Sequence, residues 1–210
     1  MTTLSKLTPN LDYAKLASDE QIERAAKALE AHGIHVVIAA NGEEAKARLF
    51  EMIPADAEVF TGTSRTLDML GFPAEVEKHY NSVRAKQAMM DRKTQMREMV
   101  KLGATPEYIV GSVHAVTEDG SVVIASFSGS QLAGYVTGAG HVVWVVGAQK
   151  IVPNLEEAMK RVREYSYPLE DERLLQAHGI NSNINKMLII SREIMPGRTT
   201  MIIVKEKLGF

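Results

Sequence analysis

The sequence predicts an α/β protein built around a mostly parallel sheet. Over residues 18–60, segments with strand character alternate with amphipathic helical segments, which is the order typical of parallel strands joined by crossover helices. Residues 141–147 are almost wholly apolar, as expected for a central strand covered on both faces. Together the two observations indicate a sheet with helices packed against it.

The elements of the first third alternate regularly. A capping box at residues 18–21 begins the first helix, and Gly33 follows its apolar stripe as a stop signal. The pattern then predicts a strand over 34–40, a helix over 43–52 and a strand over 57–60. This part of the chain therefore supplies the first strands of the sheet.

A charged, methionine-rich stretch over about 73–103 is predicted to be a helical segment without strands. Its methionines are interpreted as packing against the sheet, because methionine commonly fills gaps in a core, and the alternative is an adaptable interaction face.

The remaining strands are predicted in the last half of the chain. Residues 113–117 and 121–126 flank Asp119-Gly120, a hairpin signal because this pair accommodates positive φ. After the apolar strand, two closing strands are expected over 187–190 and 201–204, with a turn between them. No repeat or linker interrupts the pattern, so residues 1–210 are predicted to form a single domain.

Composition excludes several functional classes. The chain has 210 residues, a net charge of −2 and no cysteine. The absence of cysteine excludes disulfides, thiolate nucleophiles and cysteine-held metals. The near-neutral charge gives no electrostatic basis for binding nucleic acid or a membrane surface. No signal peptide or membrane span is legible, so a cytoplasmic protein is expected.

The first candidate site is the loop Thr61–Thr66, directly after a predicted strand. In open parallel sheets, ligands bind beyond the carboxyl ends of the strands. Gly62 permits close approach of the backbone, while the hydroxyls and Arg65 could hold a phosphate or a carboxylate. Alternatively, Thr63 or Ser64 serves only to cap its own helix. The sequence leaves both interpretations open.

The second candidate site is the segment Gly111–Gly120. Glu118 at a strand end could act as a general base or as a nucleophile. Asp119 is assigned to the turn that Gly120 completes. His114 reads more simply as a residue on the strand surface than as a metal ligand.

The third candidate site, Ser128–Gln131, repeats the small and hydroxyl residues of the first. Two such strand-to-helix junctions on one sheet could converge on one polar ligand. No G-x-S-x-G elbow surrounds Ser128 or Ser130, which argues against a hydrolase of that type. The six histidines lack metal-binding spacing, so no metal site and no bound cofactor are predicted.

Residues 111–123 read GSVHAVTEDGSVV, the most specific of several motifs in the chain. This segment resembles the core motif of LUD-domain proteins, the lactate-utilisation B/C type. Residues 128–133 and 142–152 resemble the segments that follow it, and residues 203–210 resemble the closing strand. The similarity extends from about residue 12 to the end.

This resemblance implies a three-layer α/β sandwich of the NagB/RpiA/CoA-transferase type, with a pocket at the strand ends. Lys150 is implied as a further phosphate or carboxylate contact, the alternative being an exposed lysine in a turn. Similar chains often carry cysteines near residues 176–200, and this chain has none. The predicted ligand-binding residues are Thr61, Gly62, Thr63, Ser64, Arg65, Gly111, Ser112, His114, Ser128, Gly129, Ser130, Gln131 and Lys150.

The resemblance implies a small-anion-binding or accessory subunit in the oxidation of lactate. Without a redox centre, such a protein would depend on partner subunits for electron transfer, and it could also form a homo-oligomer. The alternative is an independent enzyme of the sugar-phosphate isomerase or CoA-transferase type that uses Glu118. A regulatory binding protein is a third possibility.

Overall fold

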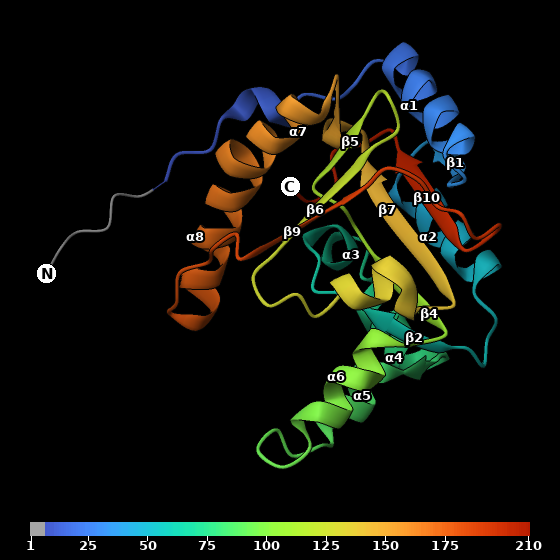
Figure 1. The fold of residues 1–210 in the computed structure, drawn as a ribbon, viewed down its shortest axis with the longest axis vertical. Coiled ribbons are helices and arrows are strands. Elements are labelled where there is room, and N and C mark those ends of the chain that lie inside the picture. Colours follow the sequence, from blue (N-terminus) through green and yellow to red (C-terminus); the bar gives the residue numbers. More distant parts are fainter. Residues whose placement is uncertain (1–6) are drawn as a thin grey trace, which may run out of the picture.

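The computed structural model describes residues 7–210 and contains a fully parallel main sheet (Figure 1). Within these residues the sheet has six strands in the order β1-β10-β7-β4-β2-β3. The strands, in that order, are His35–Ala39, Thr199–Val204, His141–Gly147, Tyr108–Gly111, Glu58–Thr61 and Asn81–Ser82. The predicted α/β class with a parallel sheet is confirmed.

Strand β7 lies at the centre of the sheet, between β10 and β4. Its residues after His141 are all buried, which agrees with their apolar run. In the register, Trp144 is paired with Met201 on one side and Gly111 on the other. An apolar strand of this length is stable only with both faces covered, and both are.

One face of the sheet is covered by three helices. They are α2 (Gly42–Met52), α3 (Arg65–Met69) and α4 (Phe72–His79). Leu49, Leu67 and Phe72 from these helices share an apolar core with Val145 and Ile202 of the sheet. Burial of these aliphatic and aromatic groups is the main force that attaches the helices.

The opposite face is covered by helix α1 (Asp19–Ala31), the π-helix η2 (Gly134–Gly138) and a second sheet. That sheet has the order β8-β5-β6-β9, with strands Ile151–Val152, Ala115–Thr117, Val122–Ser126 and Lys186–Ile190. Strands β5 and β6 form the predicted antiparallel hairpin, and Gly120 has a φ of 89°. The sequence does not predict that the hairpin belongs to a separate sheet.

The two closing strands are also distributed between the sheets. Strand β9 pairs antiparallel with β6, whereas β10 pairs parallel with β1 and β7. The segment between them, which contains Gly197 at a φ of 73°, therefore crosses from one sheet to the other. Both strands were predicted, but they are not neighbours.

A helical arm covers the outer face of the second sheet. It consists of α7 (Leu155–Arg161), the π-helix η4 (Val162–Ser166) and α8 (Tyr167–His178), the orange helices of Figure 1. Ala158 and Val162 pack against the second sheet. The short helix η1 (Leu11–Ala14) follows Asn10, whose backbone N–H donates to the Glu164 carbonyl at 2.8 Å.

The methionine-rich segment departs from its prediction. The structure divides it into α4, the two-residue strand β3, α5 (Val83–Ala88) and α6 (Met96–Ala104). Residues 81–82 pair with β2, because the chain returns to the sheet edge before Ser82 caps α5. Met99 is buried, but Met89 and Met96 are exposed, so core packing explains only part of this methionine content. No helix within residues 7–210 has the length and apolarity needed to cross a membrane.

Candidate active site

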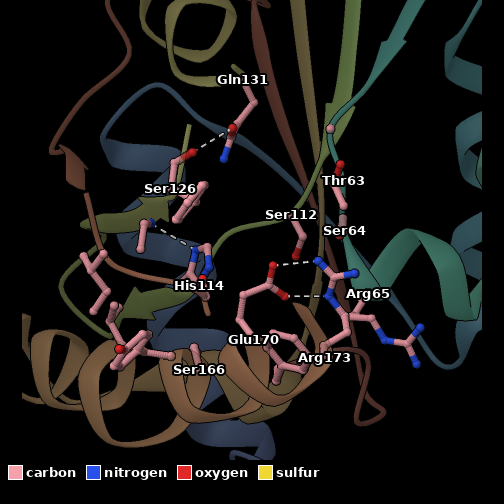
Figure 2. Close-up of a pocket in the computed structure, with 18 of the residues that line it drawn as sticks. Thr63, Ser64, Arg65, Ser112, His114, Ser126, Gln131, Ser166, Glu170 and Arg173 are labelled. Carbon is pink, nitrogen blue, oxygen red and sulfur yellow. Dashed lines mark hydrogen bonds and ion pairs between the residues drawn. The ribbon is translucent and has the colours of Figure 1, made fainter. Parts of the chain in front are cut away.

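The candidate site is a cavity of about 300 Å³ beyond the carboxyl ends of β2, β4 and β7 (Figure 2). These three strands are adjacent in the sheet, so the residues that follow them lie close together. The second sheet and helix α8 complete the walls. Its polar and charged lining comprises Thr63, Ser64, Arg65, Thr66, Ser112, His114, Ser126, Ser128, Ser130, Gln131, Lys150, Ser166, Glu170, Arg173, His178, Ser182 and Asn183.

The loop after β2 serves both of the roles that its sequence left open. Ser64 caps α3 by accepting from the Leu67 backbone N–H at 3.4 Å, and it also lines the cavity. Arg65 lines the cavity too, with its guanidinium 3.7 Å from the Asp68 carboxylate and about half exposed. The loop therefore contributes hydroxyls and a solvent-accessible cation.

Lys150 is buried at the base of the cavity, with only 2% of its surface exposed. Its Nζ lies 3.0 Å from Thr66 Oγ1 and 3.1 Å from both Ser112 Oγ and the Val113 carbonyl oxygen. It ends a short helical turn, η3 (Ala148–Lys150), that directly follows β7. The interpretation as an exposed lysine in a turn is wrong.

A second buried cation, Arg161, lies in the arm behind the cavity and is fully buried. It donates to the Gln149 carbonyl at 3.2 Å, to Ser166 Oγ at 3.1 Å and to the His114 carbonyl, while its Nη2 lacks a partner. Burial lowers its pKa to about 10, so it remains charged at neutral pH. Within residues 7–210 neither Lys150 nor Arg161 is ion-paired with a carboxylate.

The two cations shape the ionisation of the groups beside them. Burial, reinforced by the charge of Arg161, lowers the pKa of Lys150 well below its ordinary value. Burial and the charges of Lys150 and Arg161 lower the pKa of His114 to about 3. Nδ1 of His114 accepts from the Ala125 N–H at 3.1 Å, so the neutral ring carries its proton on Nε2.

The third predicted junction also reaches the cavity. Ser126 Oγ donates to Gln131 Oε1 at 3.1 Å and accepts from the Gly129 N–H at 2.8 Å. This pair of bonds folds the loop back on itself, and Gly129 adopts a φ of 86°. Ser128, Ser130 and Gln131 consequently line the cavity.

The structure brings most of the predicted binding residues together. Ten of them line the cavity: Gly62, Thr63, Ser64, Arg65, Ser112, His114, Ser128, Ser130, Gln131 and Lys150. Three others do not, and each has a structural role nearby. Thr61 is buried at the end of β2, Gly129 forms the turn, and Gly111 allows the Tyr135 hydroxyl to approach where a Cβ would lie 1.8 Å away.

Glu118, the predicted general base or nucleophile, lies outside the cavity lining. Its carboxylate accepts from Gln21 Nε2 at 2.8 Å and from Arg24 Nε at 2.7 Å, both on helix α1. Burial by itself would raise the pKa of Glu118, but these hydrogen bonds outweigh it and hold the pKa below its usual value. The carboxylate thus joins the hairpin to α1, and Asp119 bonds to Thr117 within the turn.

Sequence reasoning missed the wall formed by the arm. Glu170 and Arg173 of α8 form a two-bond ion pair, with both N–O distances 2.7 Å, beside the cavity (Figure 2). Spacing of three residues on a helix signals such a pair, but nothing in the sequence places that helix over the sheet. Both π-helices also contribute lining residues, Tyr135 from η2 and Ser166 from η4. Wide helical turns of this kind are frequent at functional sites.

Comparison with known proteins agrees with this architecture. The structure is similar to the crystal structure of a DUF162 family protein from Deinococcus radiodurans, with a TM-score of 0.55 and 10% sequence identity. The alignment covers 90% of this chain and 99% of the other. A search of curated proteins returns no match to this chain. The LUD domain model matches residues 22–204, and the chain therefore belongs to the LUD-domain family.

Proposed function

We propose that the cavity binds a small ligand carrying a carboxylate or phosphate group. The observation that carries the proposal is Lys150, buried at the base of the cavity without a carboxylate partner in residues 7–210, with the second unpaired cation, Arg161, in the arm behind the cavity. A buried charge without a counter-charge is costly, and an anion in the cavity would offset that cost. The surrounding hydroxyls and the neutral His114 offer hydrogen bonds to the oxygens of such a ligand.

The size of the cavity favours a compact ligand. At about 300 Å³ it lies at the lower end of the range for small-molecule sites. A short 2-hydroxy or 2-oxo acid or a small phosphate ester suits this volume better than a complete coenzyme A thioester. Together with family membership, this supports the more specific proposal of a role in lactate oxidation, as an accessory subunit that works with redox partners.

The alternative of an isomerase or CoA transferase that uses Glu118 has less support. Its carboxylate is occupied by Gln21 and Arg24 and lies outside the cavity lining.

Isothermal titration calorimetry tests the proposal with inorganic phosphate, lactate, pyruvate and a small sugar phosphate. We expect at least one of these anions to bind the unmodified protein and to bind K150M at least tenfold more weakly. The matched control is K101M, because Lys101 is an exposed lysine on α6 that pairs only with its neighbour Glu98. Failure of all four anions to bind the folded protein would overturn the proposal.

A further inference from the structure

The cavity contains a serine and a lysine in the geometry of a nucleophile and its base. Ser112 Oγ lies 3.1 Å from Lys150 Nζ, within the range in which a catalytic base receives a proton. Ser112 follows β4 directly and is half-buried at the cavity wall, whereas Lys150 is buried behind it. The serine, labelled in Figure 2, is therefore the one whose side chain a ligand reaches first.

We propose that Ser112 is a nucleophile for acyl transfer and that Lys150 is its general base. The substrate class is a small activated acyl compound, an ester or a thioester. This activity goes beyond anion binding and does not depend on it, because the pair would act on an uncharged ester as well.

The groups around Lys150 accommodate both of its protonation states. As an ammonium, Nζ donates to Thr66 Oγ1, Ser112 Oγ and the Val113 carbonyl oxygen. As a neutral amine it keeps the bonds to Thr66 and Val113, and its lone pair faces Ser112 Oγ. In either state Thr66 Oγ1 donates its own hydrogen bond to the Leu208 carbonyl oxygen at 3.2 Å.

The Ser112 hydroxyl has two close acceptors for its one proton, with the Val113 carbonyl oxygen farther away at 3.5 Å. The Val145 carbonyl oxygen lies at 2.7 Å and Lys150 Nζ at 3.1 Å, so a rotation about the Cβ–Oγ bond moves the proton from one to the other. An activated nucleophile needs a base beside it and a third group that orients the base. Thr66 and Val113 supply that third part, because their oxygens hold the amine of Lys150 in place. Burial beside the charge of Arg161 lowers the pKa of Lys150, which raises the share of the basic form.

The reaction balances without a further reactant except water. Ser112 Oγ attacks the acyl carbonyl carbon, and its proton passes to Lys150. The bond between the acyl carbon and the leaving oxygen or sulfur breaks, and Lys150 returns the proton to that leaving group. Water then attacks the acyl-serine ester with Lys150 as the base, releasing the acid and restoring Ser112. No oxidation or reduction takes place.

Labelling with a fluorophosphonate, which modifies activated serines, tests the pair on the full chain. Intact-mass measurement and peptide mapping of the unmodified protein should locate the adduct on Ser112. An adduct only on another residue, or no adduct on the folded protein, would overturn the proposal. This experiment uses only the unmodified protein, so its outcome does not depend on whether a variant folds.

Variants then identify the base. Because a positioned general base contributes about 10²–10⁴-fold, K150M should label more slowly by a factor in that range. Ser191 is exposed directly after β9, and Lys101 is exposed on α6. The variants S191A and K101M should therefore label at the rate of the unmodified protein, and circular dichroism checks that every variant is folded. Equal labelling rates in folded K150M and the unmodified protein would remove Lys150 as the base.

The pH dependence separates this proposal from anion binding. The labelling rate should rise with pH, because the base is the uncharged amine, whereas anion affinity should fall over the same interval. Labelling of Ser112 without binding of any anion would refute the proposed function alone. Anion binding without labelling would refute the acyl-transfer proposal alone.

Discussion

At the scale of single residues, the site is defined by cations that have no carboxylate partner. Elsewhere in the described chain, buried charge is neutralised, as in the 2.6 Å pair of Arg198 with Glu193. Lys150 and Arg161 instead rely on carbonyl and hydroxyl oxygens. Such an environment disfavours a proton on Lys150, and an anion of the proposed kind would favour it, so the proposed ligand binding should be coupled to protonation of Lys150.

Anion affinity should consequently depend on pH through Lys150. The ammonium form is present below the lowered pKa and is lost as pH rises through it, so affinity for inorganic phosphate should fall with increasing pH. The limiting slope is about tenfold per pH unit. Calorimetric titrations from pH 6 to 9 measure it, after allowance for the ionisation of phosphate itself. A K150M variant with the same slope would contradict this coupling.

His114 should make the fold sensitive to acid. Its pKa is about 3 in the folded protein and near 6.5 when unfolded, so the unfolded chain binds the extra proton between these values. Stability is therefore complete above pH 6.5 and declines on acidification, by up to about 1.4 kcal/mol per pH unit. Urea unfolding of the unmodified protein and H114N between pH 4 and 7 measures the difference. The asparagine side chain of H114N retains an acceptor for the Ala125 N–H, and parallel pH profiles would refute the assignment.

At the scale of elements, the π-helix η2 is held by one arginine. Arg198 donates to the carbonyls of Gly134 at 2.8 Å, Tyr135 at 3.2 Å and Ala139 at 3.0 Å. A wide helical turn leaves such carbonyls poorly satisfied, and the buried guanidinium supplies their donors. The π-helix also positions Tyr135, whose ring packs edge-on against Trp144 with the ring centroids 5.5 Å apart.

Removal of this arginine should be strongly destabilising. The R198A variant leaves Glu193 unpaired and the η2 carbonyls without donors, which should cost about 3–5 kcal/mol of unfolding free energy. The matched control is R192A, because Arg192 is exposed and makes one bond to the Ala31 carbonyl, and its effect should stay within about 0.5 kcal/mol. Denaturant unfolding measures the loss of unfolding free energy in R198A and in R192A. Similar small losses in both would show that η2 does not need its arginine.

The elements themselves were largely predictable, because their signals are local. The capping box at Ser18 and the apolar β7 each appear where the sequence places them. The orientation of Glu118 could not be predicted, since its partners Gln21 and Arg24 lie 97 and 94 positions away. Glu118 and Asp119 are adjacent in a tight hairpin, and their side chains face different neighbours. The packing of α1 against the hairpin determines that Glu118 faces α1.

At the scale of the whole molecule, the cavity lies between two parts of the fold. Its floor follows the strands of the main sheet, and its outer wall belongs to the α8 end of the arm. The cavity, like the orientation of Glu118, could not be predicted from local sequence signals. Glu170 and Arg173 became site residues only because the arm turns back over the strand ends, which depends on contacts distant in sequence.

A ligand that contacts both parts should stabilise the entire fold. At a concentration one hundred times its dissociation constant, a ligand that binds only the native state adds about 2.7 kcal/mol to the unfolding free energy. For a chain of this size the expected rise in melting temperature is about 5–10 °C. Differential scanning calorimetry with the tightest anion from the titration panel measures it. A melting temperature that does not change under these conditions would mean that the anion also binds the unfolded chain.

Lys150 also occupies a covalent junction. The chain leaves the main sheet at Gly147, passes through Lys150 and enters the second sheet at Ile151. A shift of Lys150 on binding of the proposed ligand should therefore also move the backbone of β8 and, through its pairing, that of β5. The amide hydrogen exchange rates of these two buried strands should therefore differ between the free protein and the protein with the proposed ligand bound.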